Sequence, residues 1–336
     1  MKKLFVPFLL VLSSQMAYSS PSAYVTNYFT NNVSIVDVGI NTATGYVDAG
    51  SFDIIHPVDV RHTPDGTKAY LIAHSNQALF VIDTASHTVT KQIDSSSFPF
   101  HAPEVVQFTP DGTKAYVSNE GGNSISIIDV AADTLTGYVH DPQATFNLPL
   151  GIAFSPDGAL ALVCNYNGNS VSVIDVATDT VTGVIDKGGF SFSQPTFVNF
   201  VNGSKAYFTA LHSAQVAIID VASQTVTGFV DPEFFSFVLP FSLRATGDGT
   251  TQVLIDAGND RALTWPVLHD SVFYASGTLI APRLLAITAD NTTAYVTDMG
   301  GNSVHILDIP TSTFTNAVDG SHFPFNGPYA ISISPY

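Results

Sequence analysis

The chain of 336 residues is poor in cysteine, in basic residues and in long apolar runs. Each shortage excludes a class of protein or site. A single cysteine, Cys164, excludes an internal disulfide, a CxxCH haem attachment site and a zinc site built from several cysteines. Only 11 Lys and Arg oppose 28 Asp and Glu, a formal net charge of −17 at pH 7, which disfavours nucleic acids and anionic lipids as partners. After the first few residues no run of about 18 apolar residues occurs, so we expect no membrane span.

The N-terminus has the pattern of a secretory signal peptide. Lys2 and Lys3 precede a short apolar stretch over residues 4–12, and Ala17-Tyr18-Ser19 places small residues at the two key positions of a cleavage site. We therefore predict a signal peptide over residues 1–19, cleaved after Ser19, and one mature domain over residues 20–336. The mature protein would then be periplasmic, secreted or held at the cell surface.

The rest of the chain is one unit repeated seven times. Within each unit four short segments rich in β-branched residues, which we call strands A to D, are separated by Gly, Asn, Asp and Pro turns. In the first complete unit they are predicted over residues 60–63, 68–73, 79–83 and 89–93. A proline opens each unit, at intervals of 42 to 46 residues: Pro57, Pro103, Pro149, Pro195, Pro240, Pro282 and Pro328.

Four-stranded units at this period predict an all-β fold, a seven-bladed β-propeller. The first copy begins near Ala23 and lacks strand A, and residues 329–334 resemble the missing strand. We therefore expect the C-terminal strand to complete blade 1 and close the ring. Closure would remove the exposed sheet edges that an open array leaves.

The repeats carry a resemblance to a known family. The segments Ala23-Tyr24-Val25-Thr26-Asn27 and Ala294-Tyr295-Val296-Thr297-Asp298, with the Pro-Asp-Gly turns, resemble the YVTN family of β-propeller repeats. The resemblance implies an exported or surface-layer binding protein, and relatives of that family include lactonases, a streptogramin lyase and quinone-dependent dehydrogenases. Because one fold hosts many functions, the resemblance leaves the activity open.

Polar residues are predicted at one end of the central channel, where the D-to-A and B-to-C loops lie; we call this end the upper mouth. The candidates for ligand binding there are His56, Asp59, Arg61, His101, Glu104, Asn199, Arg244, Arg283 and His322. One interpretation is a divalent cation or acid–base site with Asp59 and Glu104 as ligands and rim histidines, including His74, nearby. The other is a hydrated channel with exposed histidines. The short loop Glu120-Gly121-Gly122-Asn123 would either hold Ca²⁺ or form a tight turn, and we favour the turn because the spacing of a calcium loop is missing.

The arginines of this set suggest an anion site. Arg61, Arg244 and Arg283 are three of only four arginines, and a cationic patch would bind a carboxylate or another anion. Ion pairing with Asp59 and Glu104 explains them equally well.

The D-to-A loops repeat an Asp followed by aromatic residues. The candidates are Phe98, Phe100, Phe190, Phe192, Phe235, Phe237, Phe323 and Phe325. They would form either an exposed ring that captures a glycan or a peptide, or plugs buried between blades. We favour burial, since phenylalanine has no polar group and is usually buried.

No Gly-x-Ser-x-Gly elbow or phosphate-binding Gly-rich loop is present. The sequence thus predicts an exported, monomeric binding module for a protein, peptide or glycan, with no cofactor. The alternatives are a lactonase or lyase with a divalent metal ion in the channel, and a surface-layer subunit.

Overall fold

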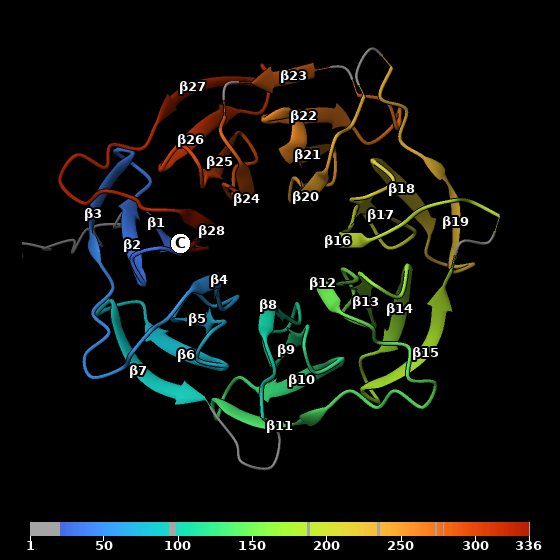
Figure 1. Cartoon of the computed structure of the whole chain (residues 1–336), viewed down its shortest axis with the longest axis horizontal. Helices are drawn as coiled ribbons and strands as arrows, with labels where there is room; N and C mark the ends of the chain where they lie inside the picture. The colour runs from blue at the N-terminus through green and yellow to red at the C-terminus, as the bar shows by residue number, and fades with distance from the viewer. Residues whose placement is uncertain are drawn as a thin grey trace, which may run out of the picture.

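The protein is a ring of seven four-stranded antiparallel sheets around a central axis, as Figure 1 shows for this computed structural model. The structure describes residues 21–93, 99–186, 189–233, 236–272, 274–277 (backbone only) and 279–335. Within these ranges the only helix is one 3-10 turn, η1 (Ala257–Asn259). The prediction of an all-β, seven-bladed propeller is therefore confirmed.

The strands follow one another blade by blade. Blade 1 holds β28 (Pro328–Ile333), β1 (Ser22–Asn27), β2 (Asn32–Asp37) and β3 (Thr42–Tyr46), and blade 2 holds β4 (Pro57–His62), β5 (Lys68–Ala73), β6 (Ala78–Asp83) and β7 (Thr88–Ile93). Blade 3 holds β8 (Pro103–Phe108), β9 (Lys114–Asn119), β10 (Ser124–Asp129) and β11 (Thr134–Tyr138), and blade 4 holds β12 (Pro149–Phe154), β13 (Leu160–Asn165), β14 (Ser170–Asp175) and β15 (Thr180–Ile185).

The remaining three blades repeat the pattern. Blade 5 holds β16 (Pro195–Phe200), β17 (Lys205–Ala210), β18 (Gln215–Asp220) and β19 (Thr225–Phe229). Blade 6 holds β20 (Pro240–Ala245), β21 (Thr251–Asp256), β22 (Arg261–Pro266) and β23 (Tyr274–Gly277). Blade 7 holds β24 (Pro282–Ile287), β25 (Thr293–Asp298), β26 (Ser303–Asp308) and β27 (Thr313–Ala317).

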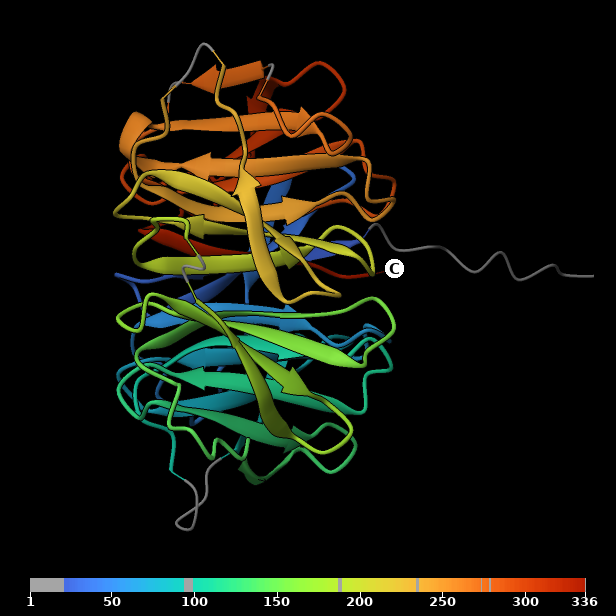
Figure 2. The ribbon, with the colours of Figure 1, turned by 90° about the vertical axis from the view of Figure 1, so that its right-hand side faces the viewer.

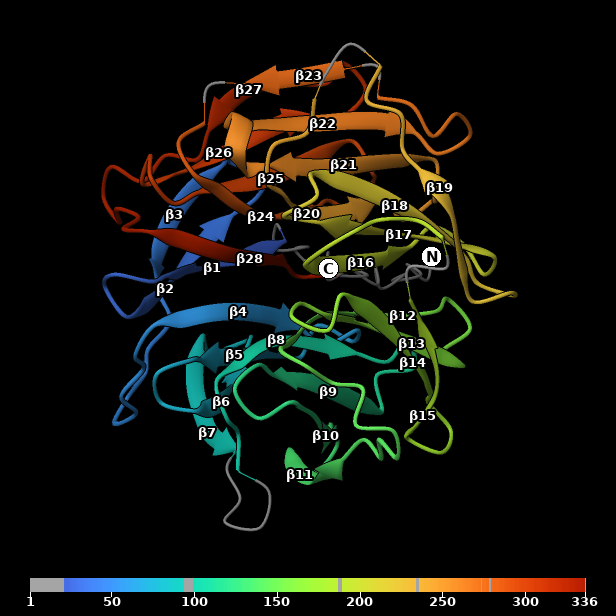
Figure 3. The same cartoon turned by 45° about the vertical axis from the view of Figure 1, so that its right-hand side comes forward.

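The two ends of the chain share blade 1. Strand β28 lies beside β1 (Figure 3) and pairs with it antiparallel, with Ala23 opposite Ile333 and Val25 opposite Ile331. The C-terminal strand therefore closes the ring, as the repeat pattern predicts.

The innermost strand of each blade begins earlier than its β-branched residues suggest. In blade 2 it starts at Pro57, which lies opposite Ala73, and ends at His62, whereas the sequence predicts residues 60–63. Proline is tolerated as the first residue of a strand because no ladder hydrogen bond is needed there. The register then shifts between Pro57 and Asp59, and a shift follows the opening proline in the other blades too. Such irregularities re-aim side chains, here at one end of the channel.

Neighbouring blades are joined by packing and by a recurrent polar contact. Between blades 3 and 4, the buried Tyr116 donates a hydrogen bond to Asp179, and Lys114 Nζ lies 2.7 Å from the same carboxylate. Burial and then this bond raise the pKa of Tyr116 well above its usual value. Tyr70 with Asp133 and Tyr207 with Asp270 repeat the contact. Blades held in this way form a rigid support for the channel.

Seen edge-on, the ring is a disc whose strands run from one face to the other (Figure 2). The upper mouth lies on the face of the D-to-A and B-to-C loops, and we call the opposite end of the channel, next to the A-to-B and C-to-D loops, the lower mouth. Across the described ranges, no helix is long and apolar enough to cross a membrane.

Candidate functional site

The upper mouth is built from two rings of residues, one residue from each blade in each ring. The first ring is the first residue of every B-to-C loop: Tyr28, His74, Glu120, Tyr166, Leu211, Ala257 and Met299. A backbone hydrogen bond to the neighbouring D-to-A loop holds each of them. In blade 3, for example, the Glu120 N–H donates to the Ala102 carbonyl at 3.0 Å, and Ala102 has a left-handed φ of 50° that turns this carbonyl.

The second ring is the residue that follows each opening proline, where the strand register shifts. Its members are Val58, Glu104, Leu150, Thr196, Phe241, Arg283 and Tyr329. Seven members of the two rings line a cavity of about 250 Å³ together with Val105, Phe197 and Leu284: Val58, Glu104, Glu120, Leu150, Tyr166, Phe241 and Tyr329. Its wall is thus mostly apolar and aromatic, with a carboxylate pair on one side.

Three side chains that can hold a cation converge at blades 2 and 3. His74 Nε2 lies 3.4 Å from Glu104 Oε1, and one ligand atom from each of His74, Glu104 and Glu120 lies within 4.8 Å of the other two. Burial, then the charge of Glu120 and a hydrogen bond shared with it, then the charge of Asp59, raise the pKa of Glu104 to about 8. At neutral pH the two carboxyl groups therefore share a proton, which a divalent cation would displace.

The opposite side of the cavity is aromatic, and the guanidinium group of Arg283 lies against it. The Arg283 guanidinium lies 5.6 Å from the ring centroid of Phe241 and 5.7 Å from that of Tyr329. Burial, and next the charge of Glu104, raise the pKa of the Tyr329 hydroxyl well above its usual value, so the phenol is neutral. This wall suits an uncharged, apolar body, and the acidic side suits a positive charge or a bound cation.

Of the predicted site residues, Glu104 lines this cavity, Arg283 lies against its aromatic wall, and the three rim histidines lie outside the cation cluster. His56 stacks on Tyr28 with centroids 4.4 Å apart, and its Nδ1 is 2.7 Å from Ser75 Oγ. His101 and His322 are exposed loop residues. The histidine beside the carboxylates is instead His74.

The predicted arginines do not form one patch, which corrects that expectation. Arg61 and Arg244 occupy the fifth position of their strands and line a different cavity, at the lower mouth. Asn199 has the same position in β16, and its amide donates to the Phe200 carbonyl. Asp59 lies buried between the two mouths, within 3.4 Å of Arg61 Nε.

The Phe-rich loops contribute mainly to the core. Buried side chains among the candidates are Phe100, Phe192, Phe237 and Phe325. Phe192, for example, packs edge-on against Phe208 of β17, with centroids 4.8 Å apart. Phe190 and Phe323 are half-buried, and Phe98 and Phe235 lie outside the described residues. The four buried rings cannot form an exposed capture surface.

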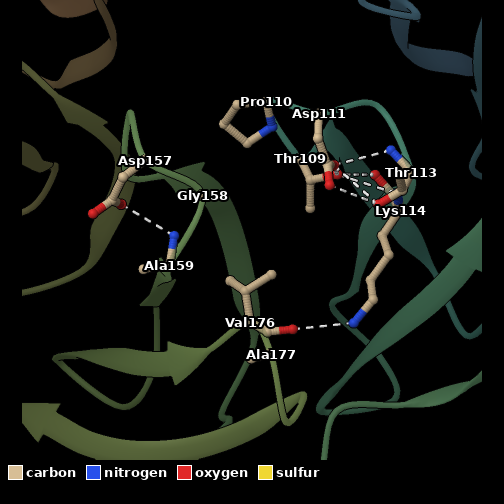
Figure 4. Close-up of a pocket in the computed structure, with 10 residues that line it drawn as sticks. All are labelled: Thr109, Pro110, Asp111, Thr113, Lys114, Asp157, Gly158, Ala159, Val176 and Ala177. Carbon is tan, nitrogen blue, oxygen red and sulfur yellow. Dashed lines mark hydrogen bonds between the residues drawn. The ribbon is translucent and has the colours of Figure 1, made fainter.

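A larger cavity, of about 550 Å³, lies between blades 3 and 4 on the lower face, next to Lys114 and Asp157 (Figure 4). A similar one of about 440 Å³, next to Lys68, lies between blades 2 and 3. Its residues are largely the repeat equivalents of the first. A groove that recurs with the repeat is a consequence of blade packing, so we assign it no specific ligand.

Comparisons with known proteins support the architecture. A model of the family described as "Lactonase, 7-bladed beta-propeller" matches residues 59–200, less than half of the chain. No curated protein sequence matches. Membership of the YVTN repeat family stays a prediction.

Several solved structures are similar. A functionally unknown protein from Desulfotomaculum acetoxidans superposes with a TM-score of 0.76 at 16% identity, over 94% of this chain and 99% of that one. A putative 6-phosphogluconolactonase from Bacteroides uniformis gives 0.74 at 14% identity, over 94% and 99%. Kuenenia stuttgartiensis hydrazine synthase gives 0.70 at 19% identity, over 87% and 94%. At these identities the likeness shows the fold alone.

Proposed function

We propose that the protein binds a small molecule in the upper mouth, with a divalent cation on His74, Glu104 and Glu120 holding the polar end of the ligand. The convergence of these three side chains, of which Glu104 and Glu120 line the aromatic-walled cavity, carries the proposal. Two carboxylates and one imidazole suit Zn²⁺ or Mn²⁺ better than Mg²⁺, which prefers oxygen ligands and water. Three protein side chains on the cation leave coordination positions open for the bound small molecule.

The cavity limits the size and the charge of the ligand. A volume of about 250 Å³ accepts a metabolite-sized molecule but not a folded partner. The net charge of −17 opposes a phosphorylated ligand, and Arg283, which lies against the cavity wall, is already positioned over two aromatic rings. We therefore expect an uncharged molecule with an oxygen that can bind the cation.

Hydrolysis of an uncharged lactone is the second candidate function. The match to the lactonase family model favours it. In this reaction water adds to the ester carbonyl, the ring C–O bond breaks, and a carboxylate, a hydroxyl and one released proton form. His74, Glu104 and Glu120 would hold the cation, and the cation would polarise the carbonyl and lower the pKa of a bound water, whose proton would pass to solvent.

Calorimetric titration of the mature protein with Zn²⁺, Mn²⁺ and Mg²⁺ at pH 8 tests the binding function. We expect one site, filled more tightly by Zn²⁺ and Mn²⁺ than by Mg²⁺. A pH-stat assay of unphosphorylated γ- and δ-lactones, with and without the cation, then tests hydrolysis. Binding without turnover leaves the binding function standing alone, and the absence of any cation binding would overturn both candidates.

We further propose that the protein acts outside the cytoplasm. The basic, apolar and small-residue pattern of residues 1–19 supports this, although these residues lie outside the described part of the chain. N-terminal sequencing of the protein from periplasmic and medium fractions is expected to begin at Ser20. Full-length protein found only in the cytoplasm would contradict export.

A further inference from the structure

We propose that the lower mouth is a second, separate binding site, which takes a small carboxylate with an apolar body. A cavity of about 410 Å³ lies there, and it includes the lower ends of the innermost strands of blades 1 to 4 and blade 6. The residues that line it are Arg61, His62, Thr63, Pro64, Gln107, Phe108, Thr109, Pro110, Phe154, Arg244, Ser332, Ile333 and Pro335. None of these is acidic, in a protein of net charge −17.

Among the residues that the structure describes, Arg61 and Arg244 have guanidinium nitrogens without a hydrogen-bond partner. Asp59, which is buried, lies 3.4 Å from Nε of Arg61 and accepts hydrogen bonds from the backbone of Val60 and Val106, so it fixes the direction of this side chain. Within the described residues the terminal nitrogens of Arg61 have no hydrogen bond, and Arg244, which is half-buried, has neither a hydrogen bond nor an ion pair. Two guanidinium groups in this state that line one cavity suit the planar fork of a carboxylate.

The wall of the same cavity includes His62, a buried side chain that has one ring nitrogen without a hydrogen-bond partner within the described residues. His62 is 8% exposed; its Nδ1 lies 2.9 Å from Ser332 Oγ, and its Nε2 has no hydrogen-bond partner within the described part of the chain. Burial, followed by the charge of His87, lowers the pKa of His62 to about 4, so the imidazole is neutral at pH 7. The positive charge of this cavity therefore comes from the arginines alone.

The net charge of this cavity and its apolar lining residues determine which class of ligand it suits. Asp59 offsets one of the two guanidinium charges, which leaves about one net positive charge for a monoanion. Phe108, Phe154 and Ile333 provide apolar contacts for the body of the ligand, and the Gln107 amide adds a polar one. A small aromatic or branched carboxylate meets all of these conditions better than an inorganic anion, which would leave the apolar wall uncovered.

Ligand-observed NMR titration of the mature protein with benzoate at pH 7 tests the proposal, with benzamide as the uncharged isostere. We expect benzoate to bind with a dissociation constant of about 1 mM or lower, and benzamide at least about tenfold more weakly. Arg244→Gln should weaken benzoate at least about tenfold. This variant is preferred to one at Arg61, whose loss would leave the buried Asp59 unpaired.

The matched control is Lys91→Gln, which removes the same charge from β7, the outer strand of blade 2. Its benzoate affinity should stay within about twofold of the wild type, since Lys91 is on the outermost strand and does not line the cavity. Equal binding by Arg244→Gln, equal binding of benzamide, or no benzoate binding would each overturn the site. Displacement of benzoate by inorganic phosphate at tenfold lower concentration would overturn the carboxylate class. None of these outcomes depends on cation binding at the upper mouth.

Discussion

Replacing Glu104 by Gln is expected to weaken Zn²⁺ or Mn²⁺ binding at pH 8 by at least about 100-fold, since even the loss of an outer hydrogen-bond partner of a metal ligand costs about 10–100-fold. Glu104 is the central member of the cluster, because it contacts His74 and shares a proton with Glu120. Gln keeps the shape of the side chain but removes the charge that attracts the cation. Calorimetric titration of the purified variant measures the effect.

The pH dependence of cation binding distinguishes a direct ligand from a general charge effect. Glu104 must lose its proton to bind a cation, and its pKa of about 8 means that affinity in the wild type should fall about tenfold per pH unit below pH 8. In Glu104→Gln the dependence between pH 6 and 8 should be much smaller. Glu233→Gln, a change of the same charge at an exposed loop residue, should behave as the wild type. If all three proteins bind cations equally, the cluster is not the site.

The fold could be predicted because every blade of a propeller repeats the same pattern of short strands and turns. Each blade alternates short β-branched segments with turns, and closure follows from the copy that lacks a strand, so β28 could be assigned to blade 1. The first residues of the innermost strands could not be predicted from the sequence. They are a proline and residues around a register shift, such as Pro57 and Val58, and these carry no strand preference of their own.

The site could be predicted only in part, because position along a strand matters as much as residue type. Arg283 is the second residue of β24 whereas Arg61 and Arg244 are the fifth of theirs, and three residues of extended chain span about 10 Å. Three arginines on innermost strands therefore separate into two mouths, although composition alone suggests one patch.

The sequence identifies His74 and Glu120 as loop residues, but their partnership with Glu104 depends on the geometry between blades. His74 belongs to blade 2, and Glu104 and Glu120 to blade 3. The sequence does contain a signal: His74 and Glu120 are each the first residue after strand B, and the seven such residues form one ring. Glu104 is likewise the first residue after an opening proline. When the repeats are aligned by the residue after strand B and by the residue after the opening proline, His74, Glu104 and Glu120 fall at these positions on neighbouring blades.

The contribution of Glu104 to the stability of the metal-free protein is expected to fall as the pH rises from 4.5 to 8, and Glu104→Gln is expected to remove this contribution. The ordinary pKa of this group is 4.5 and its folded-state pKa is about 8. Between these values the folded protein keeps a proton that the unfolded chain releases, so the stabilisation present below pH 4.5 is lost progressively up to pH 8. The loss is on the order of 3–5 kcal/mol.

Urea denaturation of the wild type and the variant at pH 5, 6, 7 and 8, in the presence of a chelator, measures this loss. Asp59, whose pKa burial raises, and His62, whose pKa burial lowers, contribute to both proteins, so the difference between the two curves reports Glu104. The variant should be similar to the wild type at pH 5 and more stable at pH 8, because the introduced amide can still donate a hydrogen bond to Glu120 without adding charge. Glu233→Gln should follow the wild type at every pH. Parallel curves for wild type and Glu104→Gln would mean that Glu104 is ionised in the folded protein at neutral pH. The shared proton would then be absent, and a cation would bind to carboxylates already charged, with little competition from protons.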